Sequence, residues 1–558
     1  MTSVQLPLVK SYWPAEDTGE VRDISLGQLL REAAASVPDR PALVNGVADP
    51  DQRTIWNYTE FLEEAERAAR ALLRDFTPGD RISIWAPNSA RWVILQQAIS
   101  LAGMVMVAIN PSCRSGEVQY ILNQSEAVGI FHADSYRGYD MVGALDELQL
   151  QCPTLRKRFS FDDWDAFMKS ADDDLDLPYV SPTDPIQIQY TSGTTGFPKG
   201  ALLHHKGVIN EAHFVSLRAG VPDGGVCINA MPMYHIGGGA VTLIGTIAMH
   251  GTFVIMPGFD PGLMLELFES YRGTHGLVVP TMLIALLDHP DRVKRDLSSL
   301  LTIMSGASAV PRTLVTRTCE VLGCQFSILF GQTEMHGVIS QTRVSDSPID
   351  QAETVGRPLP QLEVKIADPG DGSPVAIGEQ GEVCCRGYQN MLGYYNLPEM
   401  TATAVDSEGW LHMGDLGSMD ERGFLKITGR LKDMIIRGGM NIYPREIEEL
   451  LFTHPSIDDV AVIGVPDDEW GEQVAAVIQL KRDAKEPTAD ELKQFCRERL
   501  AAFKTPTWWI FVDELPVTPT GKVQKFILRD QFSKNDLTVG QIDGVTRIVR
   551  SASHKQGN

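Results

Sequence analysis

The sequence predicts an α/β protein. A large N-terminal domain of layered α/β subdomains with a small β-rich subdomain precedes a small α+β C-terminal domain. Three observations support this prediction. The chain has 558 residues, too many for one ordinary hydrophobic core. Helical patterns alternate with short apolar strands as far as Ala309. Glycine-punctuated strands then replace that alternation, and a compact α+β pattern follows Arg430.

The alternation is clear in the first 110 residues. Helical periodicity marks residues 60–76 (EFLEEAERAARALLRDF), and RISIWAP at 81–87 is typical of a strand. The uncharged run 92–109 contains glutamines and Gly103, which disfavour the alternative of a membrane-spanning helix. We expect a buried helix that turns at Gly103 into a strand.

The remaining segments set the domain boundaries. The acidic stretch 160–182 ends in prolines and is expected to be a solvated connector, a second α/β block covers 186–309, and glycine-rich strands cover 363–429. The α+β pattern that follows has helices at 444–454 and 489–503 and strands at 460–465 and 473–481. We therefore expect a large domain at 1–430, a small domain at 431–545 and a flexible tail at 546–558.

Composition excludes several classes of protein. Hydrophobic residues make up 43% and charged residues 22%, so neither a disordered nor a fibrous chain is indicated. A net charge of -23 argues against nucleic-acid binding. The eight cysteines lack the spacing of a disulfide framework or a zinc site, and the N-terminus lacks a signal-peptide core. We expect a cytoplasmic protein with no integral membrane segment; a homodimer is among the assemblies left open.

The sharpest local feature is the run Tyr190–Gly200 (YTSGTTGFPKG), which follows the strand-like IQIQ. Its glycines allow backbone amides to point at an anion, while its hydroxyls and Lys199 add donors and a positive charge. It is not a Walker A loop, because Pro198 stands where the second glycine belongs. The composition favours a polyphosphate-binding loop over a surface turn rich in glycine and threonine.

This loop resembles that of the adenylate-forming (ANL) superfamily of acyl-CoA synthetases, peptide-synthetase adenylation domains and firefly-type luciferases. Within it, the sequence is most similar to the branch of acyl-CoA synthetases and fatty-acid-CoA ligases. Six more segments match superfamily motifs in the same order: MPMYHIGG (231–238), SGASAVP (305–311), FGQTE (330–334), GWLHMGDLG (409–417), GRLKDMIIRGGMNIYPREIE (429–448) and PTGKVQK (519–525).

The resemblance implies an enzyme that uses ATP and Mg²⁺ to convert a carboxylic acid into its acyl-adenylate. Two anions must meet in that reaction, so cations and hydrogen-bond donors are required. The resemblance makes Lys522, Thr333, Glu334 and His235 catalytic, with Glu334 as the Mg²⁺ ligand. The implied nucleotide contacts are Thr191, Ser192, Gly193, Thr194, Thr195, Gly196, Lys199, Gly306, Ala307, Ser308, Phe330, Gly331, Asp415 and Arg430.

The second half-reaction passes the acyl group to a thiol, for which coenzyme A is the expected acceptor. The resemblance implies a hinge at Lys432, which makes 431–545 a small mobile α+β C-terminal domain. It also implies contacts of coenzyme A with Arg437, Gly438 and Gly439. Trp470 either stacks on the adenine of coenzyme A or packs in the domain. The tryptophans in 503–509 depart from the pattern of relatives.

The acid is expected to be a medium- or long-chain fatty acid or a similar apolar carboxylic acid. The acyl pocket implied by the resemblance consists of His235, Gly238, Gly306, Gly331, Met335 and His336, and it contains no arginine or lysine for a second carboxylate. Three roles remain open for His235: it controls the approach of the thiol, it forms part of the pocket wall beside the acid, or it is a histidine of the core. An aryl acid, a carrier-protein acceptor and a non-catalytic nucleotide-binding regulator are the alternatives.

Overall fold

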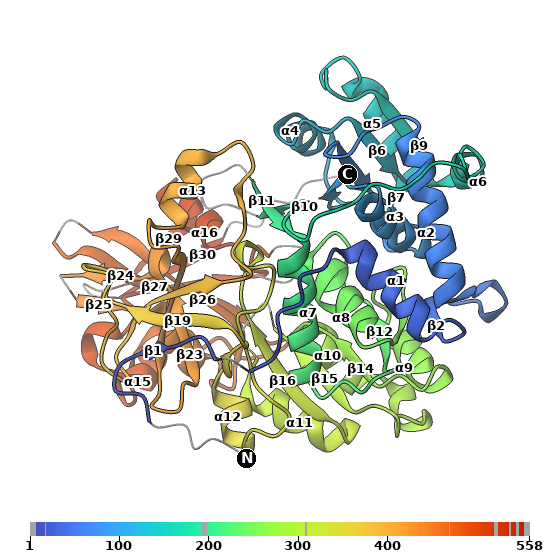
Figure 1. Ribbon diagram of the computed structural model, residues 1–558. Helices are drawn as coiled ribbons and strands as arrows, with labels where there is room; N and C mark the ends of the chain where they lie inside the picture. The colour runs from blue at the N-terminus through green and yellow to red at the C-terminus, as the bar shows by residue number, and fades with distance from the viewer. Residues whose placement is uncertain are drawn as a thin grey trace.

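The computed structural model describes residues 7–16, 18–191, 198–306, 310–438, 440–467, 469–517, 523–534, 537–542 and 546–551, with Asn441 and the last two ranges described by backbone only. The described chain has the predicted α/β architecture, with layered sheets and helices before a separate C-terminal sheet. The C-terminal segment, which we take from β24 (Ile435–Arg437) to β30 (Thr546–Ser551), is orange to red in Figure 1. It lies on the opposite side of the molecule from α2 (Tyr58–Leu73).

The first large sheet has seven strands, and its centre is parallel. A hairpin adds β11 antiparallel to β10, and the short β21 pairs with the other edge of β11. Across the sheet the strands are β21 (Gly393–Tyr394), β11 (Lys199–His204), β10 (Pro185–Thr191), β5 (Val105–Ile109), β4 (Arg81–Trp85), β6 (Gly129–His132) and β9 (Lys157–Ser160).

The second large sheet has nine strands and a parallel core from β2 to β16. Its strands are β18 (Arg357–Pro358), β17 (Ser340–Gln341), β16 (Gln325–Phe330), β15 (Thr302–Ser305), β14 (His275–Leu277), β12 (Val226–Asn229), β13 (Thr252–Ile255), β2 (Pro41–Asn45) and β3 (Ile55–Asn57). The accompanying helices are α1 (Leu26–Ser36), α7 (His205–Arg218), α8 (Leu243–Ala248), α9 (Pro261–Ser270), α10 (Pro280–Asp288), α11 (Arg312–Leu322) and α12 (Pro348–Glu353).

The helix α3 (Ala90–Leu101) lies between these two sheets. It contacts β5 of the first sheet and β2 of the second, and all its residues except Arg91 are buried. The polar Gln96 within it donates to the carbonyl of Gly239 at 2.7 Å. The prediction of a buried helix that turns into a strand is confirmed. Among the described residues, no helix has both the length and the apolar character needed to cross a membrane.

Only part of the acidic stretch 160–182 is the solvated connector that we expected: residues 169–179 form no helix or strand, and none of them is buried. The first part of the stretch instead contains the short helix α6 (Trp164–Met168), whose Trp164 and Phe167 are buried. The ring of Phe167 packs edge-on against Phe131, with ring centroids 5.0 Å apart. The acidic residues dominate the composition of this stretch, but its aromatic residues decide its position because their burial removes much more apolar surface from water.

A five-stranded sheet and the C-terminal sheet complete the fold. The five-stranded sheet contains β1 (Tyr12–Trp13), β19 (Leu362–Ala367), β20 (Gly381–Gly387), β22 (Leu411–Met419) and β23 (Leu425–Arg430), in that order. The C-terminal segment contains β24 (Ile435–Arg437), β25 (Met440–Ile442), α14 (Pro444–Leu451), β26 (Ile457–Asp467), β27 (Gly471–Leu480), α15 (Ala489–Arg497), β28 (Trp508–Val512), α16 (Lys525–Ser533), β29 (Leu537–Ile542) and β30 (Thr546–Ser551).

The position of β30 departs from the predicted boundary of the flexible tail at 546. This strand pairs in parallel with β28 and antiparallel with β29. Thr546, Ile548 and Val549 are β-branched and favour an extended strand. The tail prediction considered the polar composition of the last eight residues and overlooked this short run before them.

Candidate active site

The predicted phosphate loop connects the two strands of the β10–β11 hairpin. Thr191 and Lys199 face each other as the last residue pair of the hairpin, and the Thr191 hydroxyl donates to the Lys199 carbonyl at 3.5 Å. The Tyr120 hydroxyl donates to the carbonyl of Pro198 at 2.9 Å, which holds the end of the loop. The loop residues Ser192, Gly193, Thr194, Thr195 and Gly196 lie outside the described residues.

Tyr394 links the end of this loop to the candidate Mg²⁺ ligand. The Lys199 ammonium lies 5.0 Å from the centre of the Tyr394 ring, and the Tyr394 hydroxyl donates to Glu334 Oε1 at 2.7 Å. Burial is the main cause that raises the pKa of Tyr394, and the negative charge of Glu334 adds to the effect, so this hydroxyl keeps its proton. The sequence did not indicate Tyr394, because the contact depends on the pairing of β21 with β11.

A tight turn places Thr333 and Glu334 after β16. A side chain on Gly331 would lie 2.1 Å from the Gly337 carbonyl oxygen, so only glycine allows the chain to fold back so closely. The backbone amide of Val338 donates to Glu211 Oε1 at 2.9 Å. Burial raises the pKa of Glu211 well above its usual value, so a neutral carboxyl group supports the turn from α7. Sequence reasoning also missed Glu211.

The candidate adenine site lies at the carboxyl ends of β15 and β16. These strands are parallel neighbours, so Gly306 after β15 and Phe330 at the end of β16 reach the same sheet edge. Ligands bind at that edge in open α/β sheets. A side chain at Gly306 would lie 2.5 Å from the Leu329 carbonyl oxygen. Ala307 and Ser308 lie outside the described part of the chain.

The two candidate ribose contacts form a cross-strand pair. Asp415 on β22 faces Arg430 on β23, and Arg430 Nε lies 2.8 Å from Asp415 Oδ1. The Asp415 side chain is 5% exposed and the Arg430 side chain 33% exposed. The pair therefore places a buried carboxylate beside a partly accessible guanidinium at the end of β23, which is an edge strand of the five-stranded sheet.

His235 lies two residues before a π-helix (Gly237–Thr242) that continues into α8, and Gly238 lies within that π-helix. The Gly237 amide donates to His235 Nδ1 at 3.1 Å, and burial lowers the pKa of His235, so its imidazole is neutral. A side chain at Gly238 would lie 2.4 Å from the Pro232 carbonyl oxygen. Close backbone packing, rather than open space for an acyl chain, accounts for this glycine.

His336 occupies a buried position that the pocket prediction did not foresee. Its Nε2 accepts from the backbone amide of His204 at 3.0 Å, and its Nδ1 lies 2.7 Å from the Gln389 carbonyl oxygen. Burial lowers the pKa of His336 well below its usual value. Both ring nitrogens therefore serve backbone groups, and His336 joins β11 to the turn after β16. Met335 is fully buried beside it.

The C-terminal segment contributes Arg437 and Gly438 beside Trp470. The Arg437 guanidinium lies 5.7 Å from the Trp470 ring centre and donates to the Phe503 carbonyl at 2.8 Å. Gly438 has a φ of +56°, and a side chain there would lie 2.7 Å from the Trp470 ring. Trp470 thus packs on the Gly438 backbone. Gly439 and Lys522 lie outside the described residues.

Lys432, the candidate hinge, follows Arg430 in a short 3-10 turn. Partial desolvation of its ammonium is the main cause that lowers the pKa of Lys432, and the positive charge of Arg430 adds to the effect. The next residue, Asp433, pairs with Arg529 of α16 at 2.9 Å. The chain is therefore attached to the C-terminal segment immediately after Lys432.

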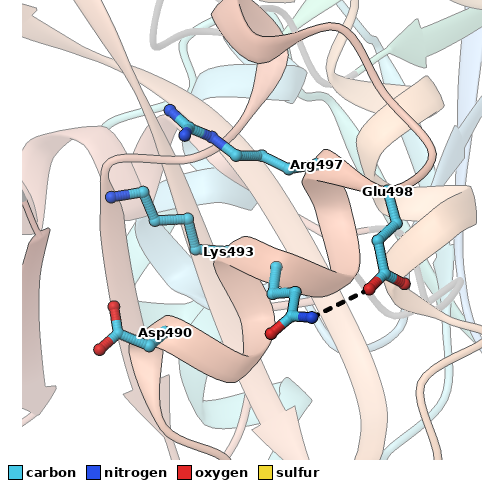
Figure 2. A pocket seen from close by; sticks show the side chains of 5 residues that line it. Asp490, Lys493, Arg497 and Glu498 are labelled. Atoms are coloured by element: carbon cyan, nitrogen blue, oxygen red, sulfur yellow. Dashed lines mark hydrogen bonds between the residues drawn. The ribbon is translucent and has the colours of Figure 1, made fainter.

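A surface hollow on α15 bears no relation to these groups. Asp490, Lys493, Gln494, Arg497 and Glu498 line it, and Figure 2 shows them spread along one face of the helix. Gln494 donates to Glu498 at 3.1 Å. Charged side chains at helical spacing form an ordinary solvated face.

Two family models match most of the chain. The model described as AMP-binding enzyme matches residues 30–395, and the model described as AMP-binding enzyme C-terminal domain matches residues 446–522. The chain is 40% identical over 539 residues to the putative acyl-CoA synthetase YngI of Bacillus subtilis, with 91% of this chain and 97% of the relative covered. It is 34% identical over 548 residues to the human mitochondrial medium-chain acyl-CoA ligase ACSF2, with 92% of this chain and 88% of the relative covered.

Solved structures give the same result. ATP-bound MatB from Rhodopseudomonas palustris matches with a TM-score of 0.83 and 27% identity, covering 92% of this chain and all of that one (100%). The o-succinylbenzoate CoA synthetase MenE of Bacillus subtilis, in complex with its acyl-adenylate intermediate, matches with a TM-score of 0.79 and 27% identity, covering 92% and 98%.

Proposed function

The chain belongs to the AMP-binding enzymes and is an acyl-CoA synthetase of the adenylate-forming superfamily, and we propose that it activates a medium- or long-chain fatty acid or a similar apolar acid. The acid first reacts with ATP to give an acyl-adenylate and pyrophosphate. The thiol of coenzyme A then displaces AMP and forms the thioester. The contact of Lys199 and Glu334 with the same tyrosine, Tyr394, carries the proposal for the first step.

The first step requires an anionic carboxylate to attack the α-phosphate of ATP. In this proposal Lys199 and the loop after Thr191 neutralise the β- and γ-phosphates, and Thr333 donates to the α-phosphate. Lys522 reaches the cleft and bridges the carboxylate and the phosphate in the transition state. Asp415 accepts from the ribose hydroxyls, while Arg430 donates to the ribose and the adenine stacks on Phe330.

Glu334 has the chemistry of a Mg²⁺ ligand. One of its oxygens accepts from the Tyr394 hydroxyl, which orients the carboxylate, and carboxylate oxygen is a ligand that Mg²⁺ prefers. When bound, Mg²⁺ would withdraw negative charge from the phosphate oxygens and from the departing pyrophosphate.

For the second step we propose rotation of the C-terminal domain about Lys432. Division of the chain at Arg430 leaves residues 431–545 as the moving unit, and the rotation exchanges Lys522 for Arg437, Gly438 and Gly439 at the active site. The packing of Trp470 on Gly438 and the half-buried Arg437 support a role for this corner in holding the pantetheine arm.

The choice of acid rests on the names of relatives and on the residue types of the proposed acyl pocket. One relative is a medium-chain acyl-CoA ligase, whereas the MenE structure contains an aryl acid as its adenylate. His235, Gly306, Gly331 and Met335 bring no positive charge to the proposed acyl pocket, which favours an apolar chain. An aryl acid is the second candidate because the MenE fold is so similar.

A panel of acids tests the proposal. Initial rates of thioester formation are measured with ATP and coenzyme A for acids from acetate to palmitate, with benzoate as the aryl member. We expect kcat/KM to peak at medium or long chains. A peak at benzoate would favour the aryl alternative, and turnover restricted to acetate or amino acids would contradict the proposal. Replacement of coenzyme A by a phosphopantetheinylated carrier protein tests the acceptor.

A further inference from the structure

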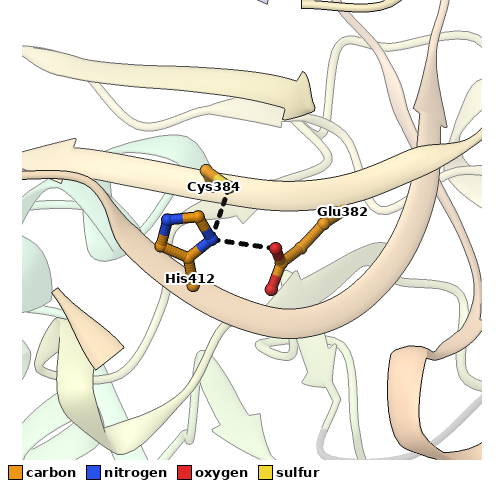
Figure 3. A group of neighbouring side chains, drawn as sticks. All are labelled: Glu382, Cys384 and His412. Atoms are coloured by element: carbon orange, nitrogen blue, oxygen red, sulfur yellow. Dashed lines mark hydrogen bonds and ion pairs between the residues drawn. The ribbon is translucent and has the colours of Figure 1, made fainter. Parts of the chain in front are cut away.

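Three side chains that the proposed reaction does not use meet between β20 and β22. Glu382 and Cys384 come from β20, and His412 comes from β22, where it faces Cys384 directly in the antiparallel pair. One potential ligand atom from each residue lies within 4.8 Å of the other two. Figure 3 shows the imidazole facing both the carboxylate and the thiol. The three side chains offer one oxygen, one sulfur and one nitrogen atom.

The orientation of each group suits a cation bound at the centre of the cluster. His412 Nδ1 lies 2.8 Å from Glu382 Oε2 and 3.6 Å from Cys384 Sγ. On the opposite side of the ring, His412 Nε2 lies 3.5 Å from Asp406 Oδ2. Histidines that bind metals usually direct their second ring nitrogen to a carboxylate in this way. The other oxygen of Glu382 accepts from the Gly414 amide at 3.1 Å.

We propose that Glu382, Cys384 and His412 bind one thiophilic divalent cation of the Zn²⁺ class. Thiolate sulfur with imidazole nitrogen selects such a cation over Mg²⁺ and Ca²⁺, and three protein ligands leave a fourth tetrahedral position for water. This site is separate from the proposed Mg²⁺ ligand Glu334. Binding joins β20 to β22, the strand that also carries Asp415.

Binding must displace the thiol proton, and the imidazole proton of His412 must move from Nδ1, where it bonds to Glu382 Oε2, to Nε2, which faces Asp406. Burial is the main cause that raises the pKa of the Cys384 thiol to about 12, and the negative charge of Glu382 adds to the effect. The thiol is therefore protonated while the site is empty. The sulfur–metal bond forms as the thiol proton passes to solvent, with no change in oxidation state. Lys365 of β19, which faces Cys384 of β20, donates to the Gly372 carbonyl at 2.9 Å, and its ammonium lies 4.5 Å from the centre of the Trp410 ring.

Sequence spacing could not have identified this site. The cysteines lack the repeated spacing of zinc motifs. The pairing of β20 with β22 brings Cys384 next to a residue 28 positions later in the chain. A mixed set of one glutamate, one cysteine and one histidine has no distinctive pattern until the strands are paired.

Cobalt titration of the full-length chain, after removal of metals with a chelator, tests the proposal. Co²⁺ bound to a thiolate gives a near-ultraviolet charge-transfer band, and tetrahedral Co²⁺ absorbs in the visible region. We expect one Co²⁺ per chain with both features, displacement by Zn²⁺, and a higher unfolding temperature when the cation is bound. Cys384→Ser should abolish the charge-transfer band and weaken binding at least tenfold. Cys113→Ser, which removes a half-buried thiol elsewhere, should change neither.

A second variant keeps the test independent of the folding of the first. His412→Gln should lower the affinity for Co²⁺ at least tenfold, and thermal unfolding without metal shows whether each variant is folded. Absence of a stoichiometric Co²⁺ spectrum in the wild-type chain would overturn the proposal, and the cluster would then be a hydrogen-bonded core group. A band that survives in folded Cys384→Ser would also overturn it, because another thiol would be the ligand.

Discussion

At the scale of single residues, Tyr394 is the side chain that best explains how the candidate active site is held together. Its hydroxyl donates to Glu334 at 2.7 Å, and its ring lies beside the Lys199 ammonium. A hydrogen bond to a charged group contributes roughly 1.5–3 kcal/mol. The same tyrosine therefore positions the proposed Mg²⁺ ligand and the proposed phosphate cation together.

The substitution Tyr394→Phe keeps the ring and removes only the hydroxyl. We expect adenylation to slow by roughly 10- to 100-fold, because Glu334 loses the group that orients it. The measurement is acid-dependent ATP–pyrophosphate exchange, with a Mg²⁺ titration to separate weaker cation binding from a slower step.

The adjacent Tyr395 provides a matched control. Its hydroxyl donates to Glu126 Oε2 at 3.0 Å in an exposed hydrogen bond, rather than to Glu334. Tyr395→Phe should leave the exchange rate within about twofold of the wild-type rate, since a partly exposed pair contributes little. Equal effects of the two substitutions would contradict the role assigned to Tyr394.

At the scale of elements, the π-helix Gly237–Thr242 depends on close backbone packing. A methyl group at position 238 would lie 2.4 Å from the Pro232 carbonyl oxygen. Gly238→Ala should therefore destabilise the large domain by about 1–3 kcal/mol, as overpacked cores usually do. Urea unfolding followed by tryptophan fluorescence measures the loss.

Gly116 in α4 (Ser115–Gln124) is the control for that substitution. Open space surrounds the position of its missing side chain, and alanine is the better helix former. Gly116→Ala should leave stability unchanged or raise it by less than about 1 kcal/mol. If both variants unfolded at the same urea concentration, the packing account of Gly238 would be wrong.

The turn at Lys432 is the second element whose role can be tested. Proline at this position fixes φ and should block rotation of the C-terminal domain. We expect Lys432→Pro to keep ATP–pyrophosphate exchange within about threefold, while overall thioester formation falls at least a hundredfold. Lys432→Ala should retain both activities. Equal loss of both activities in the proline variant would argue against a hinge.

Elements with strong local patterns could be predicted, and those formed by distant contacts could not. The run WVILQQAISLA predicted the buried helix α3, because its apolar residues surround the helix on all sides. The aromatic contacts of α6, the strand β30 and the π-helix depend on partners elsewhere in the fold. For the same reason, the motifs indicated Glu334 and Lys199 but neither Tyr394, which contacts both of them, nor Glu211, which accepts from the Val338 amide.

At the scale of the whole molecule, the fold separates the two tasks of the proposed reaction. Lys199, Phe330 and Asp415 lie on three different sheets, whereas the groups that we propose to exchange between the two steps belong to the C-terminal segment. The net charge of -23 does not prevent phosphate binding, because local backbone amides and a few cations hold the anion.

We propose that Lys522 promotes adenylation and is not needed for thiol transfer. The decisive measurement compares wild type with Lys522→Ala in two assays: ATP–pyrophosphate exchange with a fatty acid, and thioester formation from preformed acyl-adenylate and coenzyme A. We predict that the substitution reduces exchange at least a hundredfold and changes thioester formation by less than about threefold. Undiminished exchange in the variant would contradict the account.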